Sequence, residues 1–327
     1  MFTVNHVTLR GTDRPRLNDV SLTISARRTA VMGYSGAGKT SLLNLLAGFE
    51  TPDGGTISTT APTSLPRIPK AVSEYSPVGS LGPAGDRIPI FWVPQNGGLW
   101  PHLSAEQHLL SVNKSKELAD EILSCLDLNH REAAFPDELS QGERSRLSLA
   151  RALASNADVL LMDEPLSHVD PVRKPGYWDV VTRLTERSSS SIVFTSHEPE
   201  TVLRRSDSVI CLHEGAVAFQ GPTRDLYDSP PSAFLAEFLG PVNWFTLEEI
   251  QYFGIHVDRA SGMAIRPERL SVAANGTGEG EYIKCLFDGP YSESLIRIVT
   301  SGASRIIKHQ RPEVPLQEGV RVSLVLR

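Results

Sequence analysis

The sequence predicts an α/β domain built around a phosphate-binding loop, followed by a small all-β domain. Three observations support this prediction: a glycine-rich loop at residues 33–40, an apolar run ending in two carboxylates at 159–164, and short alternating segments after residue 241. The chain has 327 residues and 40% apolar content, which is enough for one large domain and one small one.

The glycine-rich loop fits the pattern G-x-x-x-x-G-K-[ST] without a mismatch. Thr29–Met32 before it has the character of a short buried strand, and Ser41–Ala47 after it favours a helix that stops at Gly48. In this motif, backbone N–H groups at a helix N-terminus and a lysine charge bind the phosphates, and a hydroxyl ligates Mg²⁺. We therefore expect a P-loop NTPase fold. Its expected nucleotide-binding residues are Gly33, Tyr34, Ser35, Gly36, Ala37, Gly38, Lys39, Thr40 and Ser41.

A second motif supplies carboxylates. Val159–Met162 is typical of a buried parallel strand, and Asp163 and Glu164 follow it directly. At that place Asp163 would meet Mg²⁺, and Glu164 could polarise the water that attacks the phosphate. The alternative for residues 33–40, an ordinary glycine-rich turn before a helix, does not explain why lysine, threonine, strand and helix all agree.

Further motifs occur in a fixed order. Between the two nucleotide motifs, Leu139–Glu143 reads Leu-Ser-Gln-Gly-Glu, and at this point the chain resembles the nucleotide-binding subunit of ABC transporters. Gln95 resembles the Q-loop glutamine of that family, Leu166–Asp170 its D-loop, and His197 its switch histidine. The resemblance covers roughly residues 1–240.

Each of these motifs has an ordinary alternative. Ser140 and Glu143 form a capping box that would start a helix in any protein, although this role is compatible with phosphate binding at the same helix N-terminus. Taken alone, His197 is more often an ordinary residue at a strand end, and Gln95 is less informative still. Their order relative to the phosphate loop and the carboxylates favours the functional interpretation.

The resemblance implies a mechanism. In the family, two nucleotide-binding domains face each other head to tail and clamp ATP and Mg²⁺ between one phosphate loop and the other domain's signature loop, so a homodimer is expected. Turnover is then mainly positioning and charge neutralisation. The implied roles are catalytic for Glu164, His197 and Gln95, metal-binding for Thr40, Gln95 and Asp163, and nucleotide-binding in trans for Ser140 and Gly142, with Asp170 sensing the opposite site.

The sequence departs from the family pattern in three places. Gln141 replaces the usual glycine of the signature, and Glu143 replaces the usual glutamine, so nucleotide closure could be slower or more dependent on Mg²⁺. The aromatic residue that stacks on adenine is absent, and Arg10 stands in its place. A guanidinium plane can stack on a base, so Arg10, or Arg14 nearby, is a substitute; the alternative is a charge that faces water.

The ATP-binding domain is expected over residues 1–240, with a helical subdomain at about 96–155. Thr3–Leu9 and Val20–Ile24 alternate like strands and predict a small antiparallel sheet on the adenine side. Ser58–Pro89 is rich in proline, serine and glycine, and we interpret it as an insertion, more in keeping with a solvated loop than with a binding element.

Residues 241–327 differ in pattern and predict a β domain of the oligonucleotide/oligosaccharide-binding type. Gly240–Asn243 and Ile265–Glu268 resemble parts of the TOBE domain of importer ATPases. The expected strands include Met263–Ile265, Tyr282–Leu286, Ser294–Val299 and Val320–Leu326.

Composition limits the other possibilities. A net charge of −6 argues against a nucleic-acid partner, three scattered cysteines favour a reducing cytoplasm, and we find no signal peptide and no apolar run near the ~20 residues of a membrane span. The resemblance implies an ATPase on the cytoplasmic face of the membrane that drives uptake through separate permease subunits and is served indirectly by a solute-binding protein. The cargo classes it implies are oxyanions, iron(III), polyamines and sugars.

Two other classes of function remain. A soluble ABC-type ATPase acting on DNA or ribosomes would need a long coiled coil or a second cassette, and neither is visible in the sequence. A ligand-binding regulatory protein with a degenerate ATPase is disfavoured by the intact Glu164 and His197.

Overall fold

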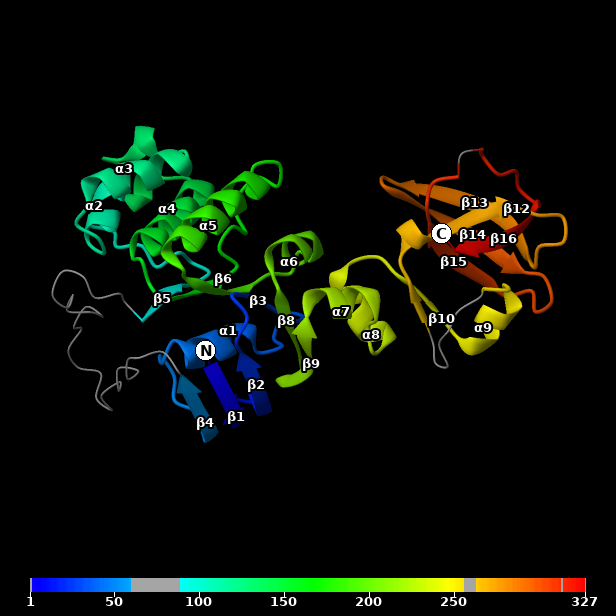
Figure 1. The fold of residues 1–327 in the computed structure, drawn as a ribbon, viewed down its shortest axis with the longest axis horizontal. Helices are drawn as coiled ribbons and strands as arrows, with labels where there is room; N and C mark the ends of the chain where they lie inside the picture. The colour runs from blue at the N-terminus through cyan, green and yellow to red at the C-terminus, as the bar shows by residue number, and fades with distance from the viewer. Residues whose placement is uncertain (1, 60–88, 256–262, 313, 327) are drawn as a thin grey trace. The chain divides into compact units, whose positions relative to one another are not determined.

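The computed structural model describes residues 2–59, 89–255, 263–312 and 314–326. The chain divides into two compact units, residues 1–223 and 224–327 (Figure 1). The second unit begins before the domain limit predicted at residue 240. One reason is that Arg266 donates hydrogen bonds to the backbone carbonyls of Tyr227, Gly240 and Pro241, which bind the segment after residue 224 to the β strands.

The first unit is organised around a six-stranded sheet with the order β5-β6-β7-β3-β8-β9. The first five strands in this order, β5, β6, β7, β3 and β8, run parallel, and β9 is antiparallel to β8. The carboxyl ends of the parallel strands therefore share one edge, where ligands of such sheets bind. The strands are β3 (Arg28–Met32), β5 (Ile90–Val93), β6 (Val159–Asp163), β7 (Ser191–Thr195), β8 (Ser208–His213) and β9 (Ala216–Pro222).

A smaller antiparallel sheet, β2-β1-β4, contains the two predicted N-terminal strands and one strand that was not predicted. Helix α1 (Lys39–Leu46) buries four leucines in a core shared by both sheets. Because α1 starts at the end of the phosphate loop, this core fixes the loop. The strands are β1 (Phe2–Leu9), β2 (Leu17–Ile24) and β4 (Gly54–Thr59).

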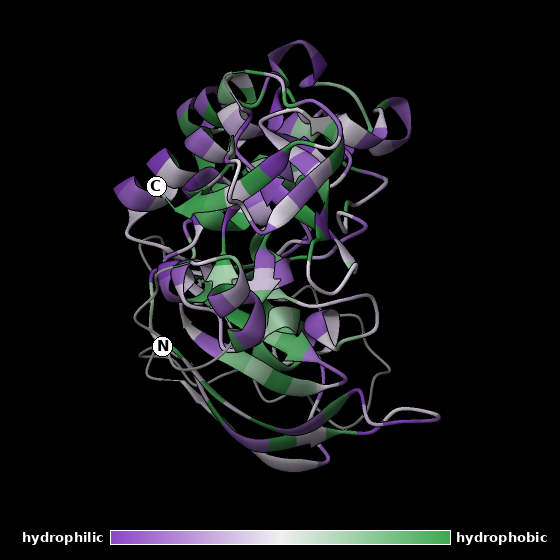
Figure 2. Cartoon of the chain, turned by 90° about the vertical axis from the view of Figure 1, so that its right-hand side faces the viewer, coloured by the Kyte–Doolittle hydropathy of each residue, from purple (hydrophilic) through white to green (hydrophobic). Residues whose placement is uncertain are grey.

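Helices α2 to α5 lie on the other side of the main sheet from α1 (Figure 1). Hydrophobic residues line the strands, whereas the outer turns of the helices are hydrophilic (Figure 2). The helices are α2 (Ala105–Leu110), α3 (Lys116–Cys125), α4 (Gln141–Ala154), α5 (Lys174–Ser188) and α6 (Pro199–Arg205), with short 3₁₀ turns η1 (Asn129–Arg131) and η2 (Pro136–Glu138).

The second unit is a small β domain, as predicted. Five antiparallel strands have the order β12-β16-β13-β14-β15, and β10 pairs with β11. Strands β10, β12 and β15 and helix α9 were not predicted. The elements from the unit boundary onward are α7 (Thr223–Asp228), α8 (Ala233–Ala236), η3 (Glu237–Leu239), β10 (Asn243–Phe245), α9 (Leu247–Tyr252), β11 (Met263–Ile265), η4 (Pro267–Arg269), β12 (Leu270–Ala274), β13 (Gly280–Asp288), β14 (Tyr291–Ile298), β15 (Ser304–His309) and β16 (Arg321–Leu326).

The insertion predicted from Ser58 to Pro89 lies outside the described residues except at its ends. Ser58 and Thr59 form ladder pairs in β4, so the segment begins later than predicted. Pro89 directly precedes β5, and its carbonyl accepts a hydrogen bond from the Val159 N–H. Within the described ranges, no helix is both long and apolar enough to cross a membrane.

Candidate nucleotide-binding and catalytic site

The predicted strand, loop and helix order is observed at residues 28–46. Gly36 and Gly38 have φ angles of +78° and +102°, a conformation that costs glycine little and other residues more. A Cβ atom on Gly38 would lie 2.6 Å from the Arg16 carbonyl oxygen, so only glycine fits there. No side chain caps the N-terminus of α1, which leaves its first N–H groups available to an anion.

Lys39 bends back over the phosphate loop. Its ammonium nitrogen donates hydrogen bonds to the carbonyl oxygens of Gly33 at 2.8 Å and Tyr34 at 3.2 Å. The Ala37 N–H also donates to the Tyr34 carbonyl, so the loop is tightly folded, while Ser35 is exposed. The loop therefore brings a positive charge close to the uncapped start of α1, as phosphate binding requires.

Asp163 is a buried carboxylate with both oxygens engaged. Its Oδ2 accepts a hydrogen bond from the Thr40 hydroxyl at 2.7 Å, and its Oδ1 accepts one from the Thr195 hydroxyl at 2.6 Å. The Thr195 oxygen in turn accepts from the Glu164 N–H at 2.8 Å. Thr195 was not among the predicted site residues, although its place at the end of the strand before His197 could have indicated it.

These oxygens suit Mg²⁺. This ion prefers oxygen ligands at about 2.0–2.1 Å in an octahedron, so adjacent ligand oxygens lie about 3 Å apart. Thr40 Oγ1 and Asp163 Oδ2, 2.7 Å apart, are close to that spacing. Gln95 follows β5, which pairs in parallel with β6, so its exposed side chain stands at the same sheet edge as Asp163.

Glu164 and His197 form a pair beside Asp163. The Glu164 Oε1 and His197 Nδ1 atoms are 3.2 Å apart, and the imidazole is 64% exposed while the carboxylate is 17% exposed. Glu164 has a φ of +48°, which is uncommon outside glycine. A carboxylate held this way, beside the predicted metal ligands, can orient a water molecule for attack on a phosphate.

An ion pair between a buried lysine and a partly exposed glutamate lies next to His197 in the sequence. The Lys174 ammonium pairs with Glu198, and the Thr201 hydroxyl donates to the other Glu198 oxygen at 2.8 Å. Since Glu198 follows His197 and Lys174 begins α5, the pair connects the segment that carries His197 to α5. The sequence carried no pattern that would have indicated this contact.

Ser140 and Gly142 lie at the N-terminus of α4, in the layer that helices α2 to α5 form on one side of the main sheet (the helical layer). The predicted capping box is present: the Ser140 Oγ accepts from the Glu143 N–H at 3.2 Å, and the Ser140 N–H donates to the Glu143 carboxylate at 2.9 Å. The Ser140 N–H, more than the Ser140 hydroxyl or Arg131, lowers the pKa of the Glu143 carboxyl, which keeps a negative charge in the signature turn, residues 139–143.

The signature turn also contacts the D-loop. A Cβ atom on Gly142 would lie 3.1 Å from the carbonyl oxygen of His168. Asp170 is exposed and starts the turn into α5, because its carbonyl accepts from the N–H groups of Arg173 and Lys174. The structure therefore brings the signature turn to the D-loop of its own chain.

The loop between β1 and β2 carries the arginines predicted to replace the aromatic residue. The Arg10 side chain is exposed, and its backbone N–H donates to Asp53 at 2.7 Å. Arg16 pairs with Glu50 in a bidentate contact. A guanidinium nitrogen of Arg14 lies 3.4 Å from where a Cβ atom on Gly36 would stand, so Arg14 reaches the phosphate loop. Arg10 and Arg14 both line an open surface hollow here.

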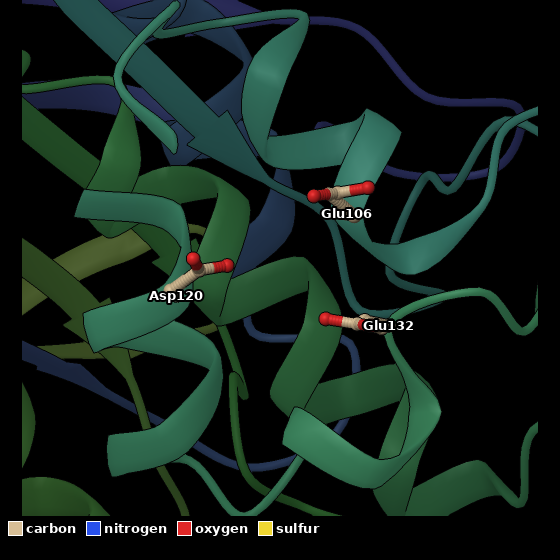
Figure 3. Close-up of side chains that lie close together, drawn as sticks. All are labelled: Glu106, Asp120 and Glu132. Atoms are coloured by element: carbon tan, nitrogen blue, oxygen red, sulfur yellow. The ribbon is translucent and has the colours of Figure 1, made fainter. Parts of the chain in front are cut away.

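Three carboxylates of the helical layer lie close together without forming a convincing metal site (Figure 3). Ligand oxygens of Glu106, Asp120 and Glu132 lie within 4.8 Å of one another. The Lys116 ammonium pairs with Glu106 and Asp120, and these contacts raise the pKa of Lys116. The lysine therefore already pairs with two of the three carboxylates.

Three features define a P-loop nucleoside triphosphatase domain. They are a phosphate loop before a helix N-terminus without a side-chain cap, a buried aspartate bonded to the threonine of that loop, and a glutamate and histidine pair at the same sheet edge. The sequence model of the ABC transporter family matches residues 17–167.

The comparisons with known proteins agree. A Fe(3+) ions import ATP-binding protein of Pectobacterium atrosepticum is 33% identical over 247 residues, covering 73% of this chain and 68% of the relative. A spermidine/putrescine import ATP-binding protein of Protochlamydia amoebophila is 30% identical over 249 residues, covering 73% and 62%. The dimeric post-hydrolysis state of the ATP-binding cassette MJ0796, bound to ADP and Pi, has a TM-score of 0.55 and 24% identity, and the match covers 68% of this chain and 99% of that one.

The chain belongs to the family of ABC transporter ATP-binding proteins, and it is an ATPase. The predicted family and fold class are confirmed.

Proposed function

We propose that this chain energises an ABC importer as a homodimer on the cytoplasmic face of the membrane, with separate permease subunits and, indirectly, a solute-binding protein. The observation that carries the proposal is that the expected ATP-binding residues of one chain lie in two separate places. Asp163, Glu164 and His197 share one sheet edge with the phosphate loop, whereas Ser140 and Gly142 stand at a helix start in another layer. A second copy, facing head to tail, supplies the missing helix N-terminus.

The cis residues have distinct tasks in this proposal. Lys39 and the loop amides hold the phosphates, and Thr40, Asp163 and Gln95 are the ligands available to Mg²⁺. The ion, when bound, neutralises charge on the phosphate oxygens. Glu164 orients or deprotonates the attacking water, and His197 contacts the γ-phosphate.

The trans residues complete the site. Ser140 and Gly142 of the second copy close on the triphosphate, and Asp170 senses the opposite site. Arg10 provides a platform for the adenine, and Arg14 lies where it could instead touch base or phosphate. Clamping on ATP and release after hydrolysis shift the population between closed and open dimers, which drives the permease.

The cargo is proposed by class. Iron(III) is named for the Pectobacterium relative, and polyamines are named for the Protochlamydia relative. Oxyanions and sugars remain on the list from the resemblance of residues 241–327 to a TOBE domain.

The catalytic part is tested by Glu164→Gln. The variant should keep ATP binding, lose roughly 10²-fold or more in turnover, and accumulate as a closed dimer with ATP, because the amide cannot accept the proton of the attacking water. Steady-state ATPase activity and size-exclusion chromatography with ATP are the measurements. Glu200→Gln, on the exposed surface of α6, is the control. Turnover near the wild-type rate in Glu164→Gln rules out the assigned role.

The transport part is tested by co-purifying the chain with the permease encoded beside its gene and reconstituting both in vesicles. Uptake that requires ATP and is abolished by Glu164→Gln is expected for one of iron(III), spermidine, putrescine, an oxyanion or a sugar. An active ATPase that neither binds the permease nor supports uptake of any of these contradicts the importer assignment.

A further inference from the structure

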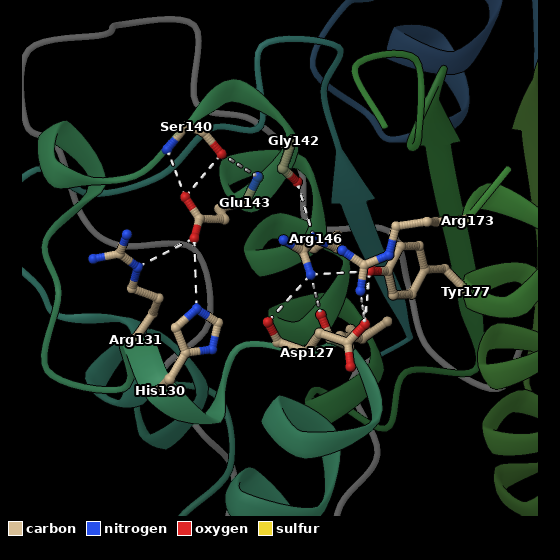
Figure 4. A network of polar contacts seen from close by, with 10 residues as sticks. Asp127, His130, Arg131, Ser140, Gly142, Glu143, Arg146, Arg173 and Tyr177 are labelled. Carbon is tan, nitrogen blue, oxygen red and sulfur yellow. Dashed lines mark hydrogen bonds and ion pairs between the residues drawn. The ribbon is translucent and has the colours of Figure 1, made fainter. Parts of the chain in front are cut away.

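Asp127 lies between the N-terminal parts of helices α4 and α5 and is linked to both by polar contacts (Figure 4). It follows α3 and has a φ of +54°, an uncommon conformation for a residue other than glycine. Its Oδ2 accepts a charged hydrogen bond from Arg173 at 2.5 Å and one from the Tyr177 hydroxyl at 2.8 Å. Arg173 is the N-cap residue of α5, and Tyr177 lies in the first turn of that helix.

Arg146 connects this carboxylate to the signature turn. The buried guanidinium donates from Nη1 to the carbonyl oxygens of Leu126 and Asp127 and to the Tyr177 hydroxyl, at 2.7 to 3.2 Å. Its Nε donates to the Gly142 carbonyl oxygen at 3.4 Å. The Tyr177 hydroxyl therefore bonds both Asp127 and Arg146, so that removing one of these partners changes the hydrogen bonding of the other.

The signature turn is fixed from two sides by these contacts. On one side, Arg146 holds the Gly142 carbonyl, and on the other, Gly142 lies against the His168 carbonyl of the D-loop. The segment 168–173 is in turn anchored at Arg173 by Asp127. The direction of the first turn of α4 thus depends on a carboxylate that lies outside every predicted motif.

We propose that Asp127 is a positioning residue for the partner copy's ATP: through Tyr177, Arg146 and Arg173 it holds the signature turn and the D-loop in the orientation that closes on the opposite triphosphate. This inference rests on the proposed head-to-tail dimer. Asp127 then affects dimer closure and leaves nucleotide binding by a single copy unchanged, a difference that a general loss of stability would not produce.

The chain contains a matched control. Glu121 of α3 forms a bidentate ion pair with Arg187 of α5, at 2.8 and 3.1 Å, which joins the same two helices at another place. Neither residue has a contact with the signature turn among the interactions seen in the described ranges. Removing the Glu121 carboxylate therefore tests whether any link between α3 and α5 has the same effect.

The experiment uses the full chain with Glu164→Gln, which is expected to dimerise with ATP. Asp127→Ala, Tyr177→Phe and Glu121→Ala are added singly. Two quantities are measured: the ATP concentration for half-maximal dimer formation, by light scattering, and the affinity of a fluorescent ATP analogue at protein concentrations where the chain is monomeric. Thermal unfolding identifies any variant that does not fold.

Asp127→Ala should raise the ATP concentration for dimerisation roughly three- to ten-fold, because it removes the acceptor of the buried Tyr177 hydroxyl, whereas the half-exposed contact with Arg173 adds little. Tyr177→Phe should shift it in the same direction by a smaller factor, and Glu121→Ala by less than about two-fold. Monomer affinity should stay within about two-fold of the parent in all three.

Several results would overturn the proposal. Dimerisation of folded Asp127→Ala at the parent's ATP concentration excludes the positioning role, and so does an equal defect in Glu121→Ala. If Asp127→Ala does not fold, Tyr177→Phe decides alone. Failure of the Glu164→Gln parent to dimerise with ATP contradicts the proposed dimer itself, and the role of Asp127 falls with it.

Discussion

At the scale of single residues, Asp163 depends on two hydroxyl groups that lie far apart in the sequence. Thr40 comes with the phosphate loop and was expected, whereas Thr195 comes from the neighbouring strand β7 and was not. Parallel pairing of β6 with β7 places Thr195 opposite Asp163, a register that the sequence of either strand alone does not contain.

Removing the Thr195 hydroxyl should destabilise the first unit. Thr195→Val leaves a buried carboxylate with one hydrogen bond fewer and the Glu164 N–H without its acceptor, which should cost about 1–3 kcal/mol. Denaturant unfolding measures this loss. Thr195→Ser keeps the hydroxyl and should stay close to wild type, and an equally large loss in Thr195→Ser would mean that the methyl group is what matters.

Arg10 is tested as the adenine platform by its own substitution. A guanidinium over a purine contributes on the order of 0.5–2 kcal/mol, so Arg10→Ala should raise the ATP dissociation constant a few-fold to about thirty-fold without changing turnover at saturation. Arg10→Tyr should restore or improve binding. The affinity is measured at low salt, where cationic contacts are strongest.

The matched comparison is Arg14→Ala. If ATP affinity is unchanged in Arg10→Ala but falls in Arg14→Ala, Arg10 faces water and Arg14 makes the contact, in keeping with its position at Gly36.

At the scale of the elements, the segment after Gln95 is held by α2 and α4. Gly97 accepts hydrogen bonds at its carbonyl from Ser148 at 2.6 Å and from Arg151 at 3.2 Å. Trp100 stacks on His108 of α2 and lies 4.5 Å from the Arg151 guanidinium carbon. The segment after Gln95 is therefore attached to the helical layer. A movement of this segment on nucleotide binding would be transmitted to α4.

His108 makes this attachment sensitive to pH. It is fully buried, its Nδ1 is 2.8 Å from the Ser104 carbonyl oxygen, and its Nε2 accepts from the Trp100 N–H at 2.9 Å, so the neutral ring is required. Burial lowers the pKa of His108 from 6.5 to about 4. Its contribution to stability is therefore fully present above pH 6.5 and is lost as the pH falls towards 4.

The size of this effect follows from the two pKa values and is about 3 kcal/mol in total. His108→Gln cannot be protonated, so the difference in unfolding free energy between wild type and this variant should shrink by about 2–3 kcal/mol between pH 7.5 and 4.5. Denaturant unfolding of the first unit at both pH values measures it. A difference that is independent of pH would mean that His108 titrates normally.

The elements that could be predicted are those with strong local signals. The phosphate loop, the strand before Asp163 and the capping box at Ser140 each carry a pattern within ten residues, and all are observed. Strands β4, β12 and β15 were missed because their alternation is short or interrupted by glycine or charge, so pairing in the sheet decides them.

The contacts that could not be predicted join distant segments. Lys174 with Glu198, and Asp127 with Arg173, are charges of ordinary appearance in the sequence, and only the packing of α5 against its neighbours pairs them. The roles of Gln95, Asp170 and Arg10 remain predictions, because each is exposed and its proposed partner is ATP, Mg²⁺ or a second copy.

At the scale of the whole molecule, the account depends on two copies sharing each ATP. One chain supplies a phosphate loop with the Glu164–His197 pair and, in a separate layer, the helix start that carries Ser140. Mixing two inactive variants tests this directly. A heterodimer of Ser140→Arg and Lys39→Ala copies has one composite site with both lesions and one with neither.

The control is a copy carrying both substitutions, mixed in excess with wild type, which leaves every heterodimer with one lesion in each site. ATPase activity is measured across the mixing ratio for both pairs. Shared sites predict that Ser140→Arg and Lys39→Ala together recover activity above either homodimer, whereas the doubly substituted copy suppresses wild type. If the two single variants recover nothing when mixed, while the doubly substituted copy leaves wild-type activity proportional to the amount of wild type, each chain works alone and the shared site is contradicted.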